Sequence, residues 1–192
     1  MDHEYDFEFK SYAEICEWLL ANPGHNQLDK IIDSAFVGNS NVLTLEDFSD
    51  LISTFGYNIN ESGCYNNDSG EIMPPLLKLA EYQDDYHIDI FCKLGAELNS
   101  EYFKDINNLI VMCIFGHGAN WIFNKDQVIK CVEILVSNGC NYDNTFEWSE
   151  YIMCSVDELL DFYKDSELVT SIIKNEFIFV EESMIKFAGK TL

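Results

Sequence analysis

Histidine is the residue of this chain best suited to acid–base chemistry near neutral pH. His117 lies between two glycines in the stretch Phe115-Gly-His-Gly-Ala119. An enzymatic role would need a partner, yet no Ser or Cys stands in a nucleophile-elbow context. A phosphate-binding loop of the Walker type is also absent from the sequence. We therefore interpret His117 as a structural residue.

Carboxylate pairs are the second group that could act in catalysis or bind metal. Three pairs stand out: Asp84-Asp85, Asp157-Glu158 and Glu181-Glu182. Their spacing does not match a calcium-binding loop, and solvated helix ends explain them better. The remaining histidines, His3, His25 and His87, lie far apart without ligand spacing. The sequence thus predicts no catalytic residue, no metal and no cofactor, and we expect a protein that is not an enzyme.

Cysteine chemistry is the third candidate. The seven cysteines are Cys16, Cys64, Cys92, Cys113, Cys131, Cys140 and Cys154. Their number is odd, no two have C-x-x-C spacing, and several lie inside apolar runs. These features are typical of small buried thiols in a reducing compartment, and not of a disulfide framework or a zinc site.

The net charge limits the choice of partner. The chain has 34 acidic residues against 11 basic ones, and every basic residue is lysine, which gives a net charge of −23. Nucleic acid and anionic membranes would be repelled, and without arginine the bidentate phosphate contact is lost. A partner protein with a basic surface is favoured. A second interpretation stays open, in which the acidity only keeps a helical surface soluble and reflects genome composition.

The charge is uneven along the chain. Lysines minus carboxylates give −5 for residues 1–24, −5 for 25–63, −6 for 64–101, −1 for 102–144 and −6 for 145–192. The nearly neutral segment contains Trp121 and Phe123, in a stretch without charged residues. Such an aromatic loop is either a binding tip or a cover that packs on the helices.

The sequence predicts a cytoplasmic protein. The N-terminus, residues 1–6, is acidic and lacks the pattern of a signal peptide. The uncharged stretch 106–124 contains four Asn, two Gly and a His, so it is a poor membrane span.

Three glycines mark equivalent helix ends. Each of Gly56, Gly95 and Gly139 follows an apolar helical segment and precedes a short segment that ends on Asn or Asp. This pattern predicts a helix that stops at a glycine in the left-handed conformation. An apolar residue (Ile59, Leu98 or Tyr142) then packs back under the helix. A fourth, decayed copy has Glu176 at the glycine position, as expected of an atypical terminal repeat.

A second helix precedes each of these endings. The four segments are Leu28–Phe36, Pro74–Ala80, Asn108–Ile114 and Val156–Phe162. Two prolines suit the opening of the second of these, where amide donors have no partner within the helix. Thr44 and Asn124 are predicted N-caps of following helices. Residues 5–22 form one more helix, which ends at Leu20-Ala-Asn-Pro-Gly24.

These motifs resemble the ankyrin repeat. The segment Pro74-Pro-Leu-Leu-Lys-Leu-Ala80 is similar to the family's Thr-Pro-Leu-His-x-Ala-Ala helix opening. Gly95-Ala-Glu-Leu-Asn99 is similar to its Gly-Ala-Asp-Val-Asn ending, and Val132 to Asp143 to its outer helix and turn. The three glycines and Glu176, which mark the helix ends, follow one another at about 37 to 44 residues, against the ~33 that is usual in the family. The Thr and His of the opening are replaced, and insertions lengthen the connections.

The resemblance implies an all-α fold, a short solenoid of stacked helix-turn-helix repeats with an N-terminal capping helix. We expect one continuous domain: residues 1–24 as the cap, 25–180 as about four divergent ankyrin-like repeats, and 181–192 as a C-terminal helix or tail. Ankyrin-like proteins bind partners on a concave face and its projecting turns. The predicted partner-binding residues are Asn60, Glu61, Asn99, Glu101, Tyr102, Trp121, Phe123, Asp143 and Phe146.

The predicted function is a non-enzymatic protein–protein interaction module, an adaptor or inhibitor that binds a basic surface. The alternative is an acidic mimic of nucleic acid that blocks the groove of a DNA- or RNA-binding enzyme. Five helical layers span ~50 Å, along which duplex DNA carries roughly 30 charges. The nearly neutral segment 102–144 weakens this alternative. The arginine-free composition suggests an AT-rich genome, such as a phage, a large virus or an intracellular bacterium, and hence an inhibitor in the host cytoplasm.

Overall fold

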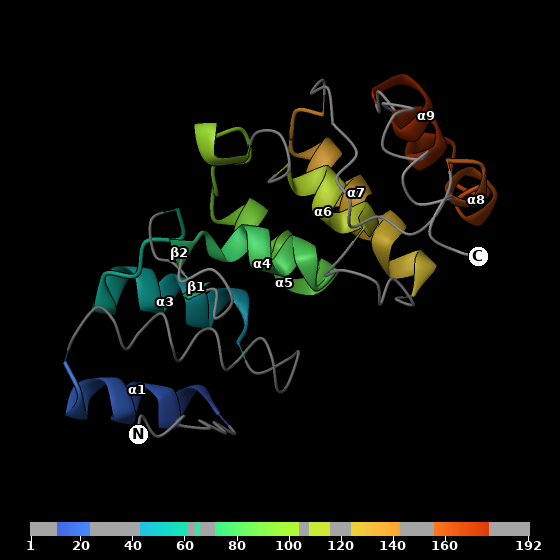
Figure 1. Cartoon of the computed structure of the whole chain (residues 1–192). Coiled ribbons are helices and arrows are strands. Elements are labelled where there is room, and N and C mark those ends of the chain that lie inside the picture. Colours follow the sequence, from blue (N-terminus) through green and yellow to red (C-terminus); the bar gives the residue numbers. More distant parts are fainter. Residues whose placement is uncertain are drawn as a thin grey trace, which may run out of the picture.

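The computed structural model describes residues 11–23, 43–60, 64–65, 72–103, 108–115, 124–142 and 156–176. These ranges fold almost entirely into helices (Figure 1). The α-helices are α1 (Tyr12–Ala21), α3 (Leu45–Phe55), α4 (Pro75–Glu81), α5 (Asp85–Lys93), α6 (Leu109–Phe115), α7 (Lys125–Ser137), α8 (Val156–Phe162) and α9 (Glu167–Glu176). A short 3-10 helix, η1, covers Glu101–Phe103. The all-α prediction is confirmed for this part of the chain.

The helices from α4 onward form three successive hairpins that lie next to one another. The pairs are α4–α5, α6–α7 and α8–α9. The first helices α4 and α6 contact each other, and among the second helices α5 contacts α7 and α7 contacts α9. Figure 1 shows the layers following one another from α1 to the α8–α9 hairpin.

Helix starts follow the local sequence. Thr44 and Asp47 form a reciprocal capping box, in which the Asp47 amide donates to Thr44 Oγ1 at 3.3 Å and the Thr44 amide donates to Asp47 Oδ2 at 2.8 Å. Pro74 and Pro75 open α4, where a missing amide donor costs nothing. Asn124 accepts from the Asp126 amide at 3.1 Å and begins α7. The predicted helix openings at Thr44, Pro75 and Asn124 are confirmed.

The apolar core runs through all the layers. Both α4 and α6 are almost completely buried, and α6 (LIVMCIF) contains no charged residue. Between layers, Phe48 of α3 meets Phe91 of α5 edge to face, with ring centroids 5.3 Å apart. Because each hairpin covers the inner helix of its neighbour, no single hairpin buries its apolar face alone.

The N-terminal helix α1 is joined to α3 by a short hydrogen bond. The Tyr12 hydroxyl donates to Asp50 Oδ2 at 2.5 Å, and the other Asp50 oxygen accepts from Thr54 Oγ1 at 2.6 Å. These donors hold the pKa of Asp50 below its usual value, and burial together with the same bond raises the pKa of Tyr12. The predicted N-terminal helix is confirmed over Tyr12–Ala21.

The structure differs from the prediction in two places. A minimal antiparallel ladder of β1 (Cys64–Tyr65) and β2 (Ile72–Met73) pairs just before α4. Glu176, predicted at a glycine position, is instead the last residue of α9. A glutamate disfavours the left-handed conformation that closes the other helices, so the helix continues through it.

Several predicted segments lie outside the described residues. They are the helix at Leu28–Phe36, the aromatic stretch Trp121–Phe123, His117, and the C-terminal segment 181–192. Among the helices that are described, none combines the length and hydrophobicity needed to cross a membrane.

Candidate interaction surface

The glycines that end the second helices all adopt the left-handed conformation. Gly56, Gly95 and Gly139 have φ angles of 71°, 81° and 86°. At Gly95 the Ala96 amide donates to the Phe91 carbonyl at 3.0 Å, and the Gly95 amide to Cys92 at 3.1 Å. The equivalent residues around Gly139 repeat both bonds, at 3.0 Å each. This is the Schellman ending, and it confirms the prediction made from the glycine spacing.

The same edge carries a repeated hydrogen bond between neighbouring units. Asn60 Oδ1 accepts from the Glu97 amide at 2.9 Å, and Asn99 Oδ1 accepts from the Asn141 amide at 2.5 Å. Each Asn lies four residues after its glycine, and each amide lies two residues after the next glycine. Asn99 also donates through Nδ2 to the Gly139 carbonyl at 2.8 Å. We call this side of the molecule, with its glycine turns and Asn side chains, the glycine-turn edge.

The opposite ends of the hairpins form a second edge, which we call the hairpin-tip edge. It consists of the turns that join the two helices of one hairpin, residues 82–84 and 163–166 in the described part. Side chains of both turns bond to the carboxyl end of α6. Gln83 Nε2 donates to the Cys113 carbonyl at 2.9 Å, and the Tyr163 hydroxyl to the Ile114 carbonyl at 3.1 Å. These bonds satisfy carbonyls that have no partner within the helix.

The first of these turns has an unusual backbone. Gln83 has a φ of 57°, which makes it the one non-glycine residue with positive φ in the described part. Its side chain is 1% exposed, and its Oε1 atom has no hydrogen-bond partner. The Gln83 amide donates to the Ala80 carbonyl at 3.1 Å and the Asp84 amide to the Leu79 carbonyl at 3.0 Å, so α4 ends as α5 and α7 do. These bonds and the side-chain bond to Cys113 hold Gln83 in a conformation that costs of order 1–3 kcal/mol in isolation.

Charged side chains tie the tips to the neighbouring layer. Asp84 caps α5 by accepting from the His87 amide at 3.1 Å, and its carboxylate contacts Nδ1 of the buried His87 imidazole at 2.6 Å. Asp85 forms an ion pair with Lys130 of α7. These carboxylates do lie at a helix start, as predicted, but both are engaged by protein partners.

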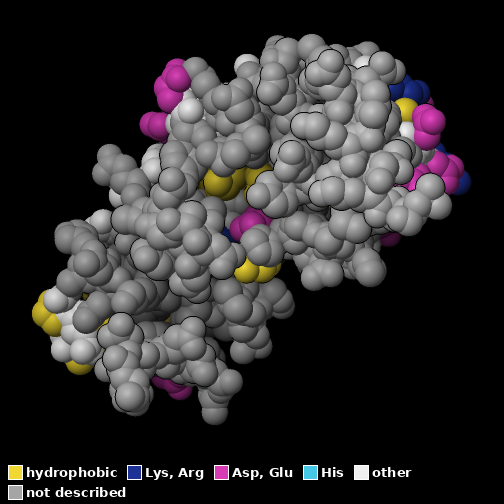
Figure 2. All heavy atoms as spheres, viewed as in Figure 1, with side chains coloured by type: hydrophobic (Ala, Val, Ile, Leu, Met, Phe, Trp, Pro, Cys, Tyr) yellow, Lys and Arg dark blue, Asp and Glu magenta, His cyan; other side chains and the backbone are white. Residues whose placement is uncertain are grey.

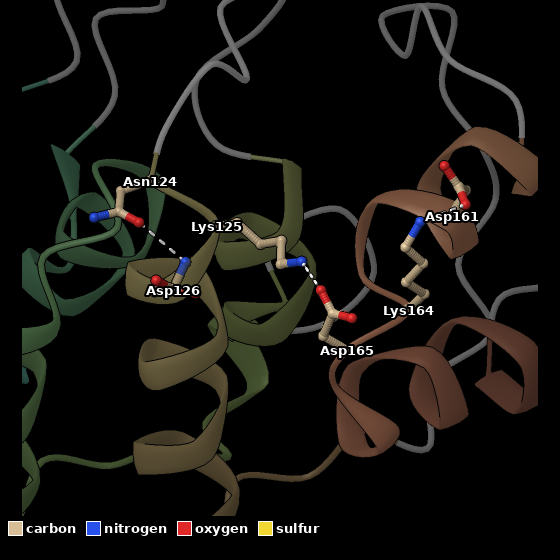
Figure 3. A network of polar contacts seen from close by, with 6 residues as sticks. All are labelled: Asn124, Lys125, Asp126, Asp161, Lys164 and Asp165. Carbon is tan, nitrogen blue, oxygen red and sulfur yellow. Dashed lines mark hydrogen bonds and ion pairs between the residues drawn. The ribbon is translucent and has the colours of Figure 1, made fainter.

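A similar network lies farther along the same edge (Figure 3). Lys125, at the start of α7, points across to Asp165 in the turn between α8 and α9 and pairs with it. This pairing lowers the pKa of Asp165. Lys164 pairs with Asp161 of α8 at 3.2 Å. Consecutive hairpins are therefore joined by charge at their tips and by amides at their glycine turns.

The lysines of the described part are largely used within the protein. Four of them pair with aspartates: Lys93 with Asp89, Lys125 with Asp165, Lys130 with Asp85, and Lys164 with Asp161. On the face drawn in Figure 2, acidic side chains and lysines lie together at the end formed by α8 and α9, and further acidic side chains lie at the upper left. Two of the four pairs, Lys125–Asp165 and Lys130–Asp85, join neighbouring hairpins, and the other two are local.

Small-molecule chemistry has little support in the described part. Burial raises the pKa of Cys140 to about 12 and that of Cys92 to about 11, so these thiols are poor nucleophiles. No group of three or more described His, Cys, Asp or Glu residues is arranged to hold a metal ion. A cavity of about 20 Å³ beside Ile59, Leu76 and Phe103 has room for about one water molecule.

The predicted partner-binding residues fall into three groups. Asn60 and Asn99 bond neighbouring units together, so their amide groups have a structural role that the sequence did not reveal. Glu101 is exposed on η1, and Tyr102 belongs to the same short helix. The others lie outside the described residues: Glu61, Trp121, Phe123, Asp143 and Phe146.

The chain was compared with protein families, curated proteins and solved structures. No family model, no curated protein and no solved structure matches it.

Proposed function

We propose that this chain is a divergent ankyrin-like solenoid that acts as a protein-binding module for a partner with a basic surface. The observation that supports this architecture is the repeated hydrogen bond of the glycine-turn edge. An Asn four residues after one glycine bonds the amide two residues after the next, across chain separations of 37 and 42 residues. Such a repeated bond is expected where successive units have the same geometry, as in a solenoid.

A binding role is supported by how the chain uses its charges. Four of the described lysines form ion pairs with aspartates, two of them between neighbouring hairpins, while the whole chain keeps a net charge of −23. A field of this sign speeds the approach of a basic partner and makes the complex sensitive to salt. The buried thiols and the water-sized cavity beside Phe103 in the described part give no comparable support to catalysis.

Mimicry of nucleic acid is the competing function. A mimic presents regularly spaced negative charge along its length. In this chain residues 102–144 have a net charge of only −1. This interruption favours an adaptor or inhibitor that combines apolar and acidic contacts over a continuous mimic.

Affinity capture from the native host, with the full chain immobilised, tests the proposal. We expect proteins with basic surfaces to be retained at about 0.05 M NaCl and mostly released at about 0.5 M, where the Debye length is only a few ångströms. Duplex DNA added as a competitor should leave an adaptor's partner bound and should displace the target of a mimic. Retention of partners without basic surfaces, unaffected by salt, would refute a charge-led interaction.

A further inference from the structure

Exposed aromatic side chains gather at one hairpin tip. In the described part, three large hydrophobic side chains are exposed: Tyr82 at 44%, Tyr86 at 41% and Leu20 at 74%. The two tyrosines lie four residues apart, on either side of the turn between α4 and α5. We call residues 81–86 the tyrosine tip. Tyrosine is enriched at the centres of binding surfaces because it offers a large rigid area at low entropic cost.

The tyrosine tip is held rigidly. Gln83 fixes the middle of the turn through its positive φ and its bond to Cys113. Asp84 fixes the start of α5 through the amide and the imidazole of His87. A backbone outlier that is held from several sides is often part of a functional surface. Because the turn is already ordered, binding to it would cost little conformational entropy.

The charges around the tip select the kind of partner. Glu81, Asp84 and Asp85 belong to the tip itself, and Asp89 follows one helical turn later. Two of these carboxylates pair with the exposed side chains of Lys130 and Lys93, which are 64% and 56% exposed. Asp89 is 40% exposed, so its pair with Lys93 is weak, and a lysine or arginine from outside can replace Lys93 at little cost. Asp85 is only 15% exposed and stays paired with Lys130. A cation placed over a tyrosine ring gains a further attraction.

We infer that the tyrosine tip is the docking site for a lysine- or arginine-rich segment of a partner protein. The aromatic rings of Tyr82 and Tyr86 contact the alkyl stems and cationic groups of the segment, and the neighbouring carboxylates pair with its charges. This inference rests on the proposed function, and it adds where the partner binds and which side chains recognise it. The site lies on the hairpin-tip edge, away from the turns that the sequence predicted as the binding surface.

Binding of a fluorescein-labelled nona-arginine peptide, measured by fluorescence anisotropy, tests the inference. The variant Y82A/Y86A removes both rings without changing the charge, and we expect it to weaken binding about fivefold to tenfold. Leu20→Ala is the control, because it truncates the other exposed large apolar side chain of the described part, which lies away from the tip on α1. We expect that control to bind as the unaltered chain does. Circular dichroism establishes that each variant keeps its helices.

A second measurement uses the unaltered chain and does not depend on the folding of a variant. Tetranitromethane nitrates exposed tyrosines, and mass spectrometry identifies the sites. Bound peptide should protect Tyr82 and Tyr86 from nitration. If the peptide binds but neither the double variant nor the nitration pattern responds, the docking site is wrong and the proposed function stands. If the unaltered chain does not bind the peptide, the basic-partner proposal fails, and the docking site fails with it.

Discussion

The two edges of the hairpin array hold neighbouring hairpins together in different ways. On the glycine-turn edge, Gly95 and Gly139 close their helices alike, and Asn60 and Asn99 use the same side-chain atom to hold the next unit. On the hairpin-tip edge, the connections differ from layer to layer, with Gln83 in one turn and the Lys125–Asp165 pair at another. The repeated edge is built for stability, and the varied edge is free to carry recognition.

Gly139→Val should produce the largest loss of stability, because valine is strained at a φ of 86°. We expect a cost of about 2 kcal/mol in the free energy of unfolding, measured by urea denaturation. A Cβ at this position would meet no atom within 4 Å, so only the backbone conformation matters. Gly139→Asn is the control and should cost well under half as much, since Asn tolerates this conformation. Equal costs for the two variants would show that the strain argument is wrong.

Asn99→Ala should have an intermediate effect. It removes two hydrogen bonds to the next unit, to the Asn141 amide and the Gly139 carbonyl, and we expect a loss of about 1 kcal/mol at this exposed position. Asn99→Asp keeps the acceptor and loses the donor, so it should fall between the alanine variant and the unaltered chain. Asn60→Ala removes one such bond and should cost less than Asn99→Ala. An Asn99→Ala chain as stable as the unaltered one would contradict the structural role of this edge.

Asp165→Asn should have the smallest effect, because its ion pair with Lys125 is exposed. The pairing lowers the pKa of Asp165, so its contribution to stability is present above the ordinary carboxyl pKa and disappears as the pH falls through the lowered value. We expect the melting temperature to fall slightly at pH 7, by less than about 1 °C, and the difference to disappear as the pH falls through the lowered pKa of Asp165. Asp157→Asn controls for the loss of one exposed charge on α8. A difference that persists in acid would mean that the carboxylate acts through something other than its charge.

Local signals in the sequence sufficed for much of the fold. Glycine spacing predicted the left-handed helix ends, and the Pro74–Pro75 pair and Thr44 predicted helix starts, because caps depend on a few neighbouring residues. The whole of α8, Val156–Phe162, was predicted from its apolar spacing. Such features require no knowledge of distant segments.

The candidate site was less predictable, since it depends on contacts between distant residues. Gln83 ends α4 with the same pair of backbone bonds that Gly95 and Gly139 make at their helices, but a glutamine gives no sequence signal for this left-handed ending. Its side chain also bonds to Cys113, 30 residues away. Asn60 and Asn99 looked like exposed turn residues, and their partners lie 37 and 42 residues along the chain. The exposure of Tyr82 likewise follows from the packing of the turn, because aromatic residues elsewhere in the chain, such as Phe48, are fully buried.

The two side-chain caps on α6 determine how the array can come apart. In many repeat proteins, neighbours share mainly apolar surface, so terminal layers can fray one at a time. Here the Cys113 and Ile114 carbonyls accept bonds from hairpins on opposite sides, and peeling off either hairpin strips a buried carbonyl of its partner. We therefore expect the three hairpins to melt as one cooperative unit, so that truncation beside the central hairpin would do more than shorten the molecule.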